Sequence, residues 1–203
     1  METKAEFPFY RPEEPALVRA FFQFSHLKHL YRQGWLQHGI PAVRAESVAE
    51  HTLGVAVLTM LLASEFPEVD ADRAVRIALV HDFGEVYAGD FTPRDHVTAE
   101  EKYESERRSV ERLFDGLPEA DELFGLWEEY ERGESMEAKL VRQADRLEMA
   151  FQAAVYAREG AENMGDFYYS AAKAMHWPFL EDLLHAVEDD LLGEERDSNP
   201  GPD

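Results

Sequence analysis

Two of the eight histidines lie on strongly apolar stripes, and the second is followed at once by an aspartate. His51 shares a helical face with apolar residues at spacings of −3, +4, +7 and +11, namely Val48, Val55, Leu58 and Leu62. His81 ends the apolar run that starts at Ile77, and Asp82 comes directly after it. Because a charge at the end of a buried helix needs a partner, these side chains are candidates for one interior site.

A second carboxylate joins them from a third helical stripe. Asp145 shares its face with Val141 and Met149, so three helices bring two imidazoles and two carboxylates inward. His and Asp are ligands of intermediate hardness that suit Zn, Mn, Fe, Co or Ni, and two of each can surround a divalent ion while leaving room for water and substrate. The alternative is a set of hydrogen-bonded core groups without a metal.

The composition and the absence of certain motifs exclude or disfavour several classes of site and function. The 203 residues include no cysteine, which excludes disulfides, thiolate catalysis, thiolate-bound zinc and iron–sulfur clusters. Forty-two acidic and twenty basic residues give a formal net charge of −22, which disfavours binding to nucleic acid or to an anionic membrane surface. The sequence has no glycine-rich phosphate loop and no Gly-x-Ser-x-Gly motif, which disfavours kinases, dehydrogenases and serine hydrolases.

The elements that position these residues are predicted to be helices. Apolar residues recur every three or four positions and alternation at two is scarce, which indicates an all-α bundle of about six to eight helices. Capping-box patterns, Ser47 with Glu50 and Thr98 with Glu101, mark two helix starts. We expect helices over 15–33, 47–66, 71–83, 98–114, 119–132, 136–158, 166–175 and 178–192, with the acidic segment 119–134 mainly a solvated face.

One domain is expected, because 45% apolar and 12% aromatic residues suffice for one core. We expect an N-terminal extension over 1–14, the folded domain over 15–193 and a disordered acidic tail over 194–203. The N-terminus lacks the apolar segment of a signal peptide, and the most apolar stretch, Leu53 to Ala63, is shorter than the roughly 18–20 residues that cross a bilayer. A cytoplasmic location without a membrane partner is therefore expected.

Four segments resemble a known family. They are Glu46-Ser-Val-Ala-Glu-His51, Ala78-Leu-Val-His-Asp82-Phe-Gly-Glu85, Gly89-Asp90-Phe-Thr-Pro93 and Gln143-Ala-Asp145-Arg-Leu-Glu. Together they resemble the H…HD…D signature of HD-domain metal-dependent phosphohydrolases, and are most similar to the 5′-deoxynucleotidase branch. The resemblance spans about Phe22 to Phe151. The sequence departs from the pattern at Phe91, where an aliphatic residue is usual, and in the insert-like segment 37–42 before Val43 and Arg44, which alters the nucleotide-facing loop.

The resemblance implies an HD-domain helical bundle with a metal at its centre. It assigns His51, His81, Asp82 and Asp145 as ligands of one divalent transition metal ion, which could be Mn, Co, Zn, Fe or Ni. Family members that bind two ions use two further histidines between the HD dipeptide and the last aspartate. In this sequence His96 is the only histidine in that interval, which favours a single ion.

Two more carboxylates have implied catalytic roles. Glu85 lies four residues after His81, so its carboxylate faces the same cavity if the helix persists. A divalent ion can lower the pKa of water from 15.7 to roughly 7, and a positioned carboxylate can then accept the proton as hydroxide attacks phosphorus. The alternative is that Glu85 only orients His81. Asp90 matches the family carboxylate near the leaving 5′-oxygen; alternatively it caps a loop.

Substrate contacts follow the same resemblance. Arg32 and Trp35 resemble the family's pair that holds phosphate and sugar, because a guanidinium matches phosphate oxygens and an indole can wall off a nucleoside. Alternatively, Trp35 only fills a gap between helices. Arg94 and Lys102 are further local cations that could contact the substrate or lie on a solvated face.

The implied activity is removal of the 5′-phosphate from nucleoside monophosphates, with 2′-deoxy forms preferred, by a homodimer. Two alternatives stay open. The same ligands could act on a cyclic nucleotide, a nucleoside triphosphate or a guanosine polyphosphate, or the chain could be a nucleotide-binding module without catalysis. The presence of Glu85 and Asp90 favours catalysis, because a purely structural metal site is better closed by further ligands.

Overall fold

The computed structural model describes residues 11–193, and the regular structure in that range is helical apart from a bridge between Tyr31 and Ser47. The all-α prediction is confirmed. The α-helices are α1 (Ala16–Phe24), α2 (Gln33–Gln37), α3 (Val48–Leu62), α4 (Ala71–Val80), α5 (Glu85–Ala88), α6 (Ala99–Phe114), α7 (Ala120–Arg132), α8 (Met136–Arg158), α9 (Gly165–Ala174), α10 (Pro178–His185) and α11 (Glu188–Leu192). Three short 3-10 turns are η1 (Ser25–Lys28), η2 (Ala63–Glu65) and η3 (Pro93–Asp95).

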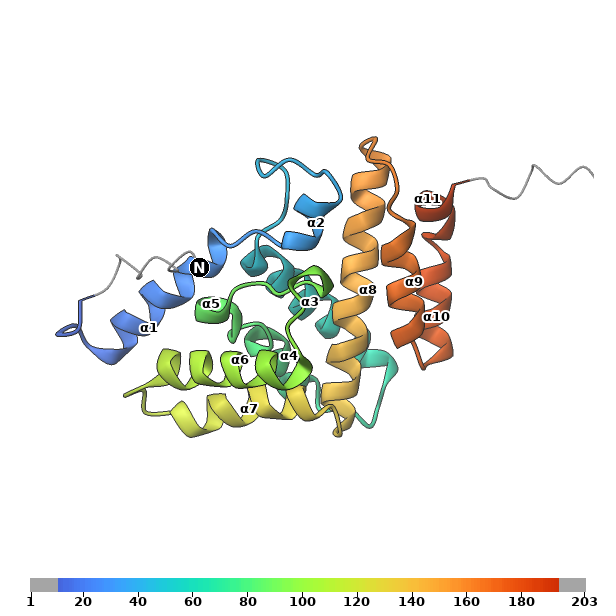
Figure 1. The fold of residues 1–203 in the computed structure, drawn as a ribbon. Coiled ribbons are helices and arrows are strands. Elements are labelled where there is room, and N and C mark those ends of the chain that lie inside the picture. The colour runs from blue at the N-terminus through green and yellow to red at the C-terminus, as the bar shows by residue number, and fades with distance from the viewer. Residues whose placement is uncertain (1–10, 194–203) are drawn as a thin grey trace, which may run out of the picture.

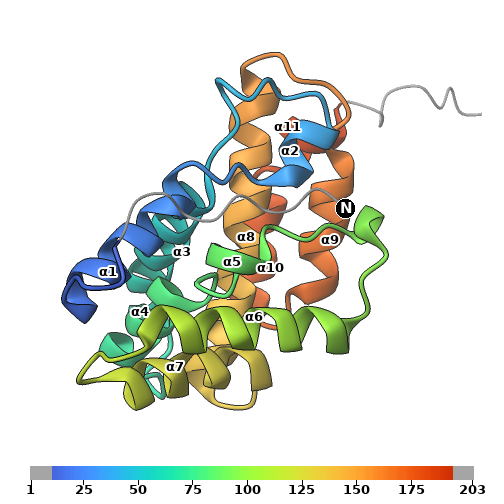
Figure 2. The same cartoon turned by 60° about the vertical axis from the view of Figure 1, so that its left-hand side comes forward.

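Three helices form the centre of the bundle, because α3, α4 and α8 each pack against the other two. In Figure 1, α8 stands upright, with α9, α10 and α11 on its right and α6 and α7 to the left of its lower half. Figure 2, turned by 60°, places α1 and α3 on one side of α8 and α9 on the other. The short α5 packs on α6, and α7 contacts both α4 and α8. The central helices are therefore covered on several sides.

The composition of the central helices explains their position. The helix α3 is apolar almost all round, and its face with Val48, Val55 and Leu62 is buried as predicted. The longest helix, α8, buries both small and large apolar residues, and its alanines let neighbouring helices approach closely. The buried row along α8 comprises Ala138, Leu140, Val141, Ala144, Leu147, Ala150, Ala153 and Ala154.

Both predicted capping boxes are confirmed. The Ser47 hydroxyl accepts from the Glu50 N–H, and the Glu50 carboxylate accepts from the Ser47 N–H at 2.7 Å. Thr98 and Glu101 make the same reciprocal pair at the start of α6. These bonds satisfy orphan donors of the first helical turn and so set where α3 and α6 begin.

The structure corrects several predicted helix bounds. The expected helix over 15–33 ends at Phe24, and the chain passes through η1 into an extended segment in which the Arg32 N–H donates to the Glu46 carbonyl. The helix expected over 71–83 ends at Val80. The helix expected over 178–192 divides into α10 and α11. The short helices α2 and α5 have no periodicity that sequence analysis could detect, since each is about one turn long.

The structure describes only part of the predicted terminal segments. Residues 1–10 of the expected extension and the whole expected tail over 194–203 are outside the described residues. Within the described part, Val48–Glu65 is long and apolar enough by composition to cross a membrane, with 44% of that window buried. The core helix of a helical bundle passes the same test, so this finding is weak evidence for a membrane span.

The contact between α5 and α6 gives a test of the fold. A Cβ atom added at Gly84 would lie 2.5 Å from Glu106 Cβ and 3.2 Å from Glu106 Cα. Since the backbone of α6 cannot yield cheaply, Gly84→Ala is expected to lower the free energy of unfolding by about 1–3 kcal/mol, the usual cost of overpacking. Denaturant unfolding of the unaltered chain and of Gly84→Ala measures this difference in free energy.

A matched control lies in α7. Nothing approaches within 4 Å of a Cβ atom added at Gly125, which sits inside a helix. Gly125→Ala should therefore stabilise the protein by about 0.5–1 kcal/mol through helix propensity. Equal effects of the two substitutions would contradict the close approach of α5 and α6.

Candidate metal centre and phosphate site

His51 is placed in the interior by the second turn of α3 and is fully buried. Its Nε2 lies 3.1 Å from Asp145 Oδ1, on α8, and 3.7 Å from Asp82 Oδ2. Its Nδ1 lies 2.6 Å from Glu148 Oε2, one turn further along α8. Both ring nitrogens of His51 therefore face carboxylates.

His81 and Asp82 follow the end of α4. The Nδ1 of His81 lies 2.7 Å from the carbonyl oxygen of Ala78, which can only accept, so Nδ1 carries the proton. The other ring nitrogen, Nε2, lies 3.2 Å from Asp82 Oδ2. The rings of His51 and His81 meet edge to face with centroids 5.6 Å apart. The structure thus brings together the four residues that the resemblance assigns to the metal.

These atoms fit a divalent cation. Ligand atoms of His51, His81 and Asp145 all lie within 4.8 Å of one another. His81 Nε2 and Asp82 Oδ2 are buried and have no hydrogen-bond partner, although buried polar atoms are normally satisfied. Two imidazoles and two carboxylates form a donor set that suits a transition metal ion. An ion at this point would satisfy the atoms that the protein leaves unpaired.

The charges of the cluster depend on one another. Burial raises the pKa of Asp82, but His81, Arg32 and His51 lower it more, and the net pKa lies well below the usual range. Burial also raises the pKa of Asp145, and the hydrogen bond from His51 reverses the effect. Burial lowers the pKa of His51, whereas hydrogen bonds to Asp145 and Glu148 raise it to about 10. The carboxylates are therefore ionised and demand nearby positive charge.

Glu85 begins α5 and is only 3% exposed. Burial and the neighbouring carboxylates of Asp82 and Asp90 raise its pKa well above the ordinary value, against the effect of Arg32. Its Oε2 is buried without a hydrogen-bond partner. Although α4 has already ended, Glu85 still faces the cluster as predicted. A carboxyl group with a raised pKa is suited to exchanging a proton near neutral pH.

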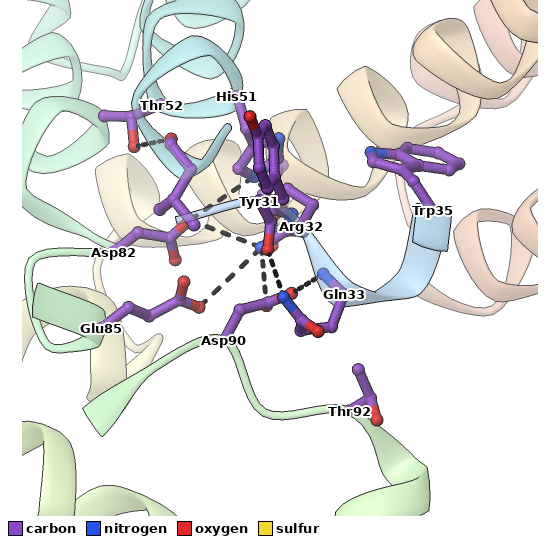
Figure 3. A network of polar contacts seen from close by, with 12 residues as sticks. Tyr31, Arg32, Gln33, Trp35, His51, Thr52, Asp82, Glu85, Asp90 and Thr92 are labelled. Carbon is purple, nitrogen blue, oxygen red and sulfur yellow. Dashed lines mark hydrogen bonds and ion pairs between the residues drawn. The ribbon is translucent and has the colours of Figure 1, made fainter. Parts of the chain in front are cut away.

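Arg32 links the candidate metal ligands to the candidate catalytic carboxylates. Its Nη1 lies 3.6 Å from Asp82 Oδ2, 3.9 Å from Glu85 Oε1 and 3.5 Å from Asp90 Oδ1. Figure 3 shows these three contacts converging on the guanidinium. Asp90 Oδ2 also accepts from the Gln33 N–H at 2.5 Å, which ties the loop after α5 to the start of α2.

A cavity of about 370 Å³ opens beside Arg32 and Asp90. Its apolar walls come from α2, α8, α9 and the loop after α5, and include Trp35, Phe91, Met149 and Phe167. Arg94 and Arg146 add positive charge to the lining. Gln37, from the insert-like segment, lines the same cavity and donates to the Thr92 hydroxyl at 2.9 Å.

Trp35 both fills a gap between helices and lines the cavity, so its position is compatible with either interpretation. It is 2% exposed and packs between α8 and α9, with ring centroids 5.1 Å from Tyr156 and 4.2 Å from Phe167. Its Nε1 donates to Glu46 Oε1 at 2.8 Å. Trp35 lines the cavity, and Figure 3 shows it set apart from the carboxylates of Asp82, Glu85 and Asp90. Its contact with a nucleoside stays a prediction.

Lys102 lies on α6, where its Nζ is 3.5 Å from Glu106 Oε1. Burial lowers the pKa of Lys102, but Glu106, Glu85 and Asp82 raise it more. Lys102 is therefore a cation near the carboxylates that already has a partner on its own helix. Its contact with the substrate also stays a prediction.

Sequence reasoning missed three residues around Asp145. The Tyr130 hydroxyl donates to Asp145 Oδ2 at 3.0 Å, although α7 was expected to be mainly a solvated face. The Arg146 Nε lies 3.8 Å from the same oxygen. Glu148 contacts His51. The spacing of three between Asp145 and Glu148 was a usable signal, because such residues share a helical face. Tyr130 had no such signal.

The chain is similar to known proteins over most of its length. The sequence profile of the HD domain family matches residues 24–187. The 5′-deoxynucleotidase HDDC2 of Homo sapiens is 37% identical over 181 residues, covering 84% of this chain and 86% of that protein.

Two solved structures are similar over most of their length. The PH0347 protein of Pyrococcus horikoshii OT3 has a TM-score of 0.73 and 29% identity, covering 85% of this chain and 99% of that one. A protein described as a predicted metal-dependent phosphohydrolase, from Magnetospirillum magnetotacticum MS-1, has a TM-score of 0.68 and 27% identity, covering 87% and 94%. The chain belongs to the HD domain family, in the branch that contains the 5′-deoxynucleotidases.

Proposed function

We propose that this chain is a metal-dependent phosphohydrolase that removes the 5′-phosphate from nucleoside monophosphates and prefers 2′-deoxy forms. One observation carries the proposal. Buried imidazole and carboxylate atoms without hydrogen-bond partners converge beside Glu85 and the Arg32 guanidinium, next to a cavity of about 370 Å³. The similarity to 5′-deoxynucleotidases supports the nature of the substrate.

His51, His81, Asp82 and Asp145 would hold one divalent transition ion, which their donor set restricts to Mn, Co, Zn, Fe or Ni. When bound, the ion supplies Lewis-acid stabilisation of phosphoryl oxygens and lowers the pKa of water. The protein holds the donor atoms close together and away from water. His81 is fixed by the Ala78 carbonyl, and Asp145 by the Tyr130 hydroxyl.

Arg32 binds the phosphate group in this proposal. Its guanidinium lies at the border between the carboxylate cluster and the cavity. Its contacts with Asp82 and Glu85 are both longer than 3.5 Å. Phosphate oxygens match the donors of a guanidinium better than these distant carboxylates do. Substrate phosphate is thereby oriented with its ester bond toward Asp90 and the cavity.

Two carboxylates move protons. Glu85 accepts the proton of the attacking water at Oε2, the oxygen without a hydrogen-bond partner. The raised pKa of Glu85 makes this transfer easier near neutral pH. Asp90, held by the Gln33 N–H, is placed to supply or relay a proton to the leaving 5′-oxygen.

The nucleoside occupies the cavity beside Arg32. Cavities of 300–1,000 Å³ with apolar walls and a few polar groups are typical small-molecule sites, and this one has aromatic walls from Phe91 and Phe167. Trp35 and Gln37 lie where they could limit space near the sugar.

The ligand set predicts the behaviour of two variants. Asp145→Ala should lose the bound ion, because the remaining ligands can neither balance its charge nor complete its coordination. His185→Ala, at an exposed position of α10, should retain it. Elemental analysis after dialysis decides, and equal metal content in the unaltered chain and Asp145→Ala would reject this ligand set.

The role of Glu85 predicts a separation of catalysis from binding. Glu85→Gln should retain the metal and the substrate affinity and lower kcat by about 10²- to 10⁴-fold, the usual contribution of a positioned acid–base group. Metal content and kcat are measured on the same preparation. Loss of the ion would make Glu85 a ligand, and an unchanged kcat would remove it from the mechanism.

A substrate panel tests the proposed reaction itself. The metal-loaded protein should release phosphate from 2′-deoxynucleoside 5′-monophosphates with a higher kcat/KM than from ribonucleotides. Cyclic nucleotides, triphosphates and guanosine polyphosphates are the comparison substrates. Turnover of these alone would replace the proposal with a different phosphoesterase, and no turnover of any would favour a binding module.

A homodimer in the cytoplasm stays a prediction. Apolar side chains at the outer face of α3 are compatible with a second copy, since Leu53, Met60 and Leu61 are each more than half exposed.

A further inference from the structure

We propose that Glu148 is a positioning residue that fixes the tautomer and orientation of His51 for metal binding. The inference rests on the proposed metal site and adds a residue to which none of the preceding assignments gives a role. Glu148 does not touch the reacting atoms and is not among the four ligands.

The geometry of the contact is the first support. His51 Nδ1 lies 2.6 Å from Glu148 Oε2, and the side chains are 0% and 12% exposed. An ionised carboxylate can only accept, so Nδ1 carries the proton. Metal binding requires a neutral imidazole, and its lone pair is then on Nε2, the nitrogen that faces Asp145 and Asp82. A carboxylate behind a histidine in this way is known to orient metal-binding imidazoles.

The two helices are built to allow this contact. Asp145 and Glu148 lie one turn apart on α8, so one helical face supplies both the ligand and the orienting group. Gly54 lies one turn after His51 on α3, and a Cβ atom there would overlap the Glu148 carboxylate, lying 3.0 Å from its Cδ. Glycine is unfavourable inside a helix by roughly 0.5–1 kcal/mol relative to alanine. Its presence here leaves the space that Glu148 occupies.

His81 is oriented by a backbone carbonyl instead of a carboxylate. Its Nδ1 faces the Ala78 carbonyl of its own helix at 2.7 Å. His51 is the fourth residue of α3, and the Val48 carbonyl three residues before it already accepts from the Thr52 hydroxyl at 2.8 Å, so the acceptor for Nδ1 comes from another element. Glu148 supplies that acceptor from α8.

A rival interpretation places a second cation at the same point. Glu46, His51 and Glu148 also offer ligand atoms within 4.8 Å of one another. Glu46 Oε1 already accepts from the Trp35 indole at 2.8 Å. A cation bound to Nδ1 would require that nitrogen to give up its proton, which is incompatible with the hydrogen bond to Glu148. The two interpretations therefore differ in metal stoichiometry.

The test is a Mn²⁺ titration of the full metal-free chain by competition with a chelator. The unaltered protein should bind one equivalent. Glu148→Ala should weaken binding by about 10- to 100-fold, the usual effect of losing such a partner. Glu148→Gln should weaken it less, because its amide oxygen still accepts from Nδ1. Gly54→Ala, which displaces Glu148 without altering it, should also weaken binding.

Glu46→Gln is the matched control. It removes a carboxylate from the same buried group and keeps the acceptor for Trp35, but it leaves the hydrogen bond to Nδ1 intact. Its Mn²⁺ affinity should stay near that of the unaltered chain. An equal loss in Glu46→Gln and Glu148→Gln would show that only charge matters and would overturn the proposal.

A spectroscopic measurement separates orientation from general damage to the fold. In the chain loaded with diamagnetic Zn²⁺, the Nδ1–H protons of His51 and His81 should both be visible by ¹⁵N-resolved NMR. Glu148→Ala should lose only the His51 signal, since His81 keeps its carbonyl partner. Loss of both signals, or of neither, would contradict a specific role for Glu148.

The remaining outcomes are also decisive. Two equivalents of Mn²⁺ in the unaltered chain, with one lost in both Glu46→Gln and Glu148→Gln, would establish the rival cation site. Unchanged affinity in every variant would remove Glu148 from metal binding and leave the proposed function intact. No binding by the unaltered chain would overturn the proposed function and this inference together.

Discussion

Ionisable side chains held away from water are the constraint around which this structure is arranged. Two imidazoles and three carboxylates, His51, His81, Asp82, Glu85 and Asp145, meet where α3, α4, α5 and α8 converge. Burying such groups costs several kcal/mol for each ion unless partners compensate. Arg32 and the Tyr130 hydroxyl supply part of that compensation, and the unpaired atoms that remain converge where a divalent cation would supply the rest.

Several irregularities of the backbone follow from this requirement. After α1 the chain passes through η1 and is extended at Tyr31 and Arg32, which brings the Arg32 guanidinium over the carboxylates. The helix α4 stops at Val80, so His81 and Asp82 lie in a turn where both side chains face inward. Gly84 then allows the next turn to pack directly on α6. The extended segment thus brings Arg32 to the common centre, and the end of α4 brings His81 and Asp82 there.

The overall acidity of the chain and the local charge of the site act over different distances. A net charge of −22 opposes binding of large polyanions, whereas interactions between exposed charges are screened beyond about 8 Å at physiological ionic strength. The lining of the cavity beside the candidate metal ligands includes Arg32, Arg94 and Arg146. Asp90 and Asp166 line the same cavity, so a small phosphate ester meets three guanidinium groups among carboxylates on a negative protein.

The apolar periodicity and the capping patterns determined the all-α class, most helix ranges and the inward direction of His51 and Asp145. Such signals are local, because residues three or four apart share a helical face whatever the rest of the chain does. Glu85 was also identifiable from its spacing of four residues from His81, whereas Asp90 was identified only by the resemblance of its segment to the HD-domain family. These features needed no knowledge of the other helices.

Only the tertiary structure decided which residues complete the site. Tyr130 reaches Asp145 from a helix that the sequence marked as a solvated face, and Arg32 reaches Asp82, Glu85 and Asp90 across 50 or more positions of chain. Glu148 orients toward His51 because Gly54 leaves space on α3. These contacts depend on how helices pack, and packing brings together side chains whose separation along the chain carries no periodic signal.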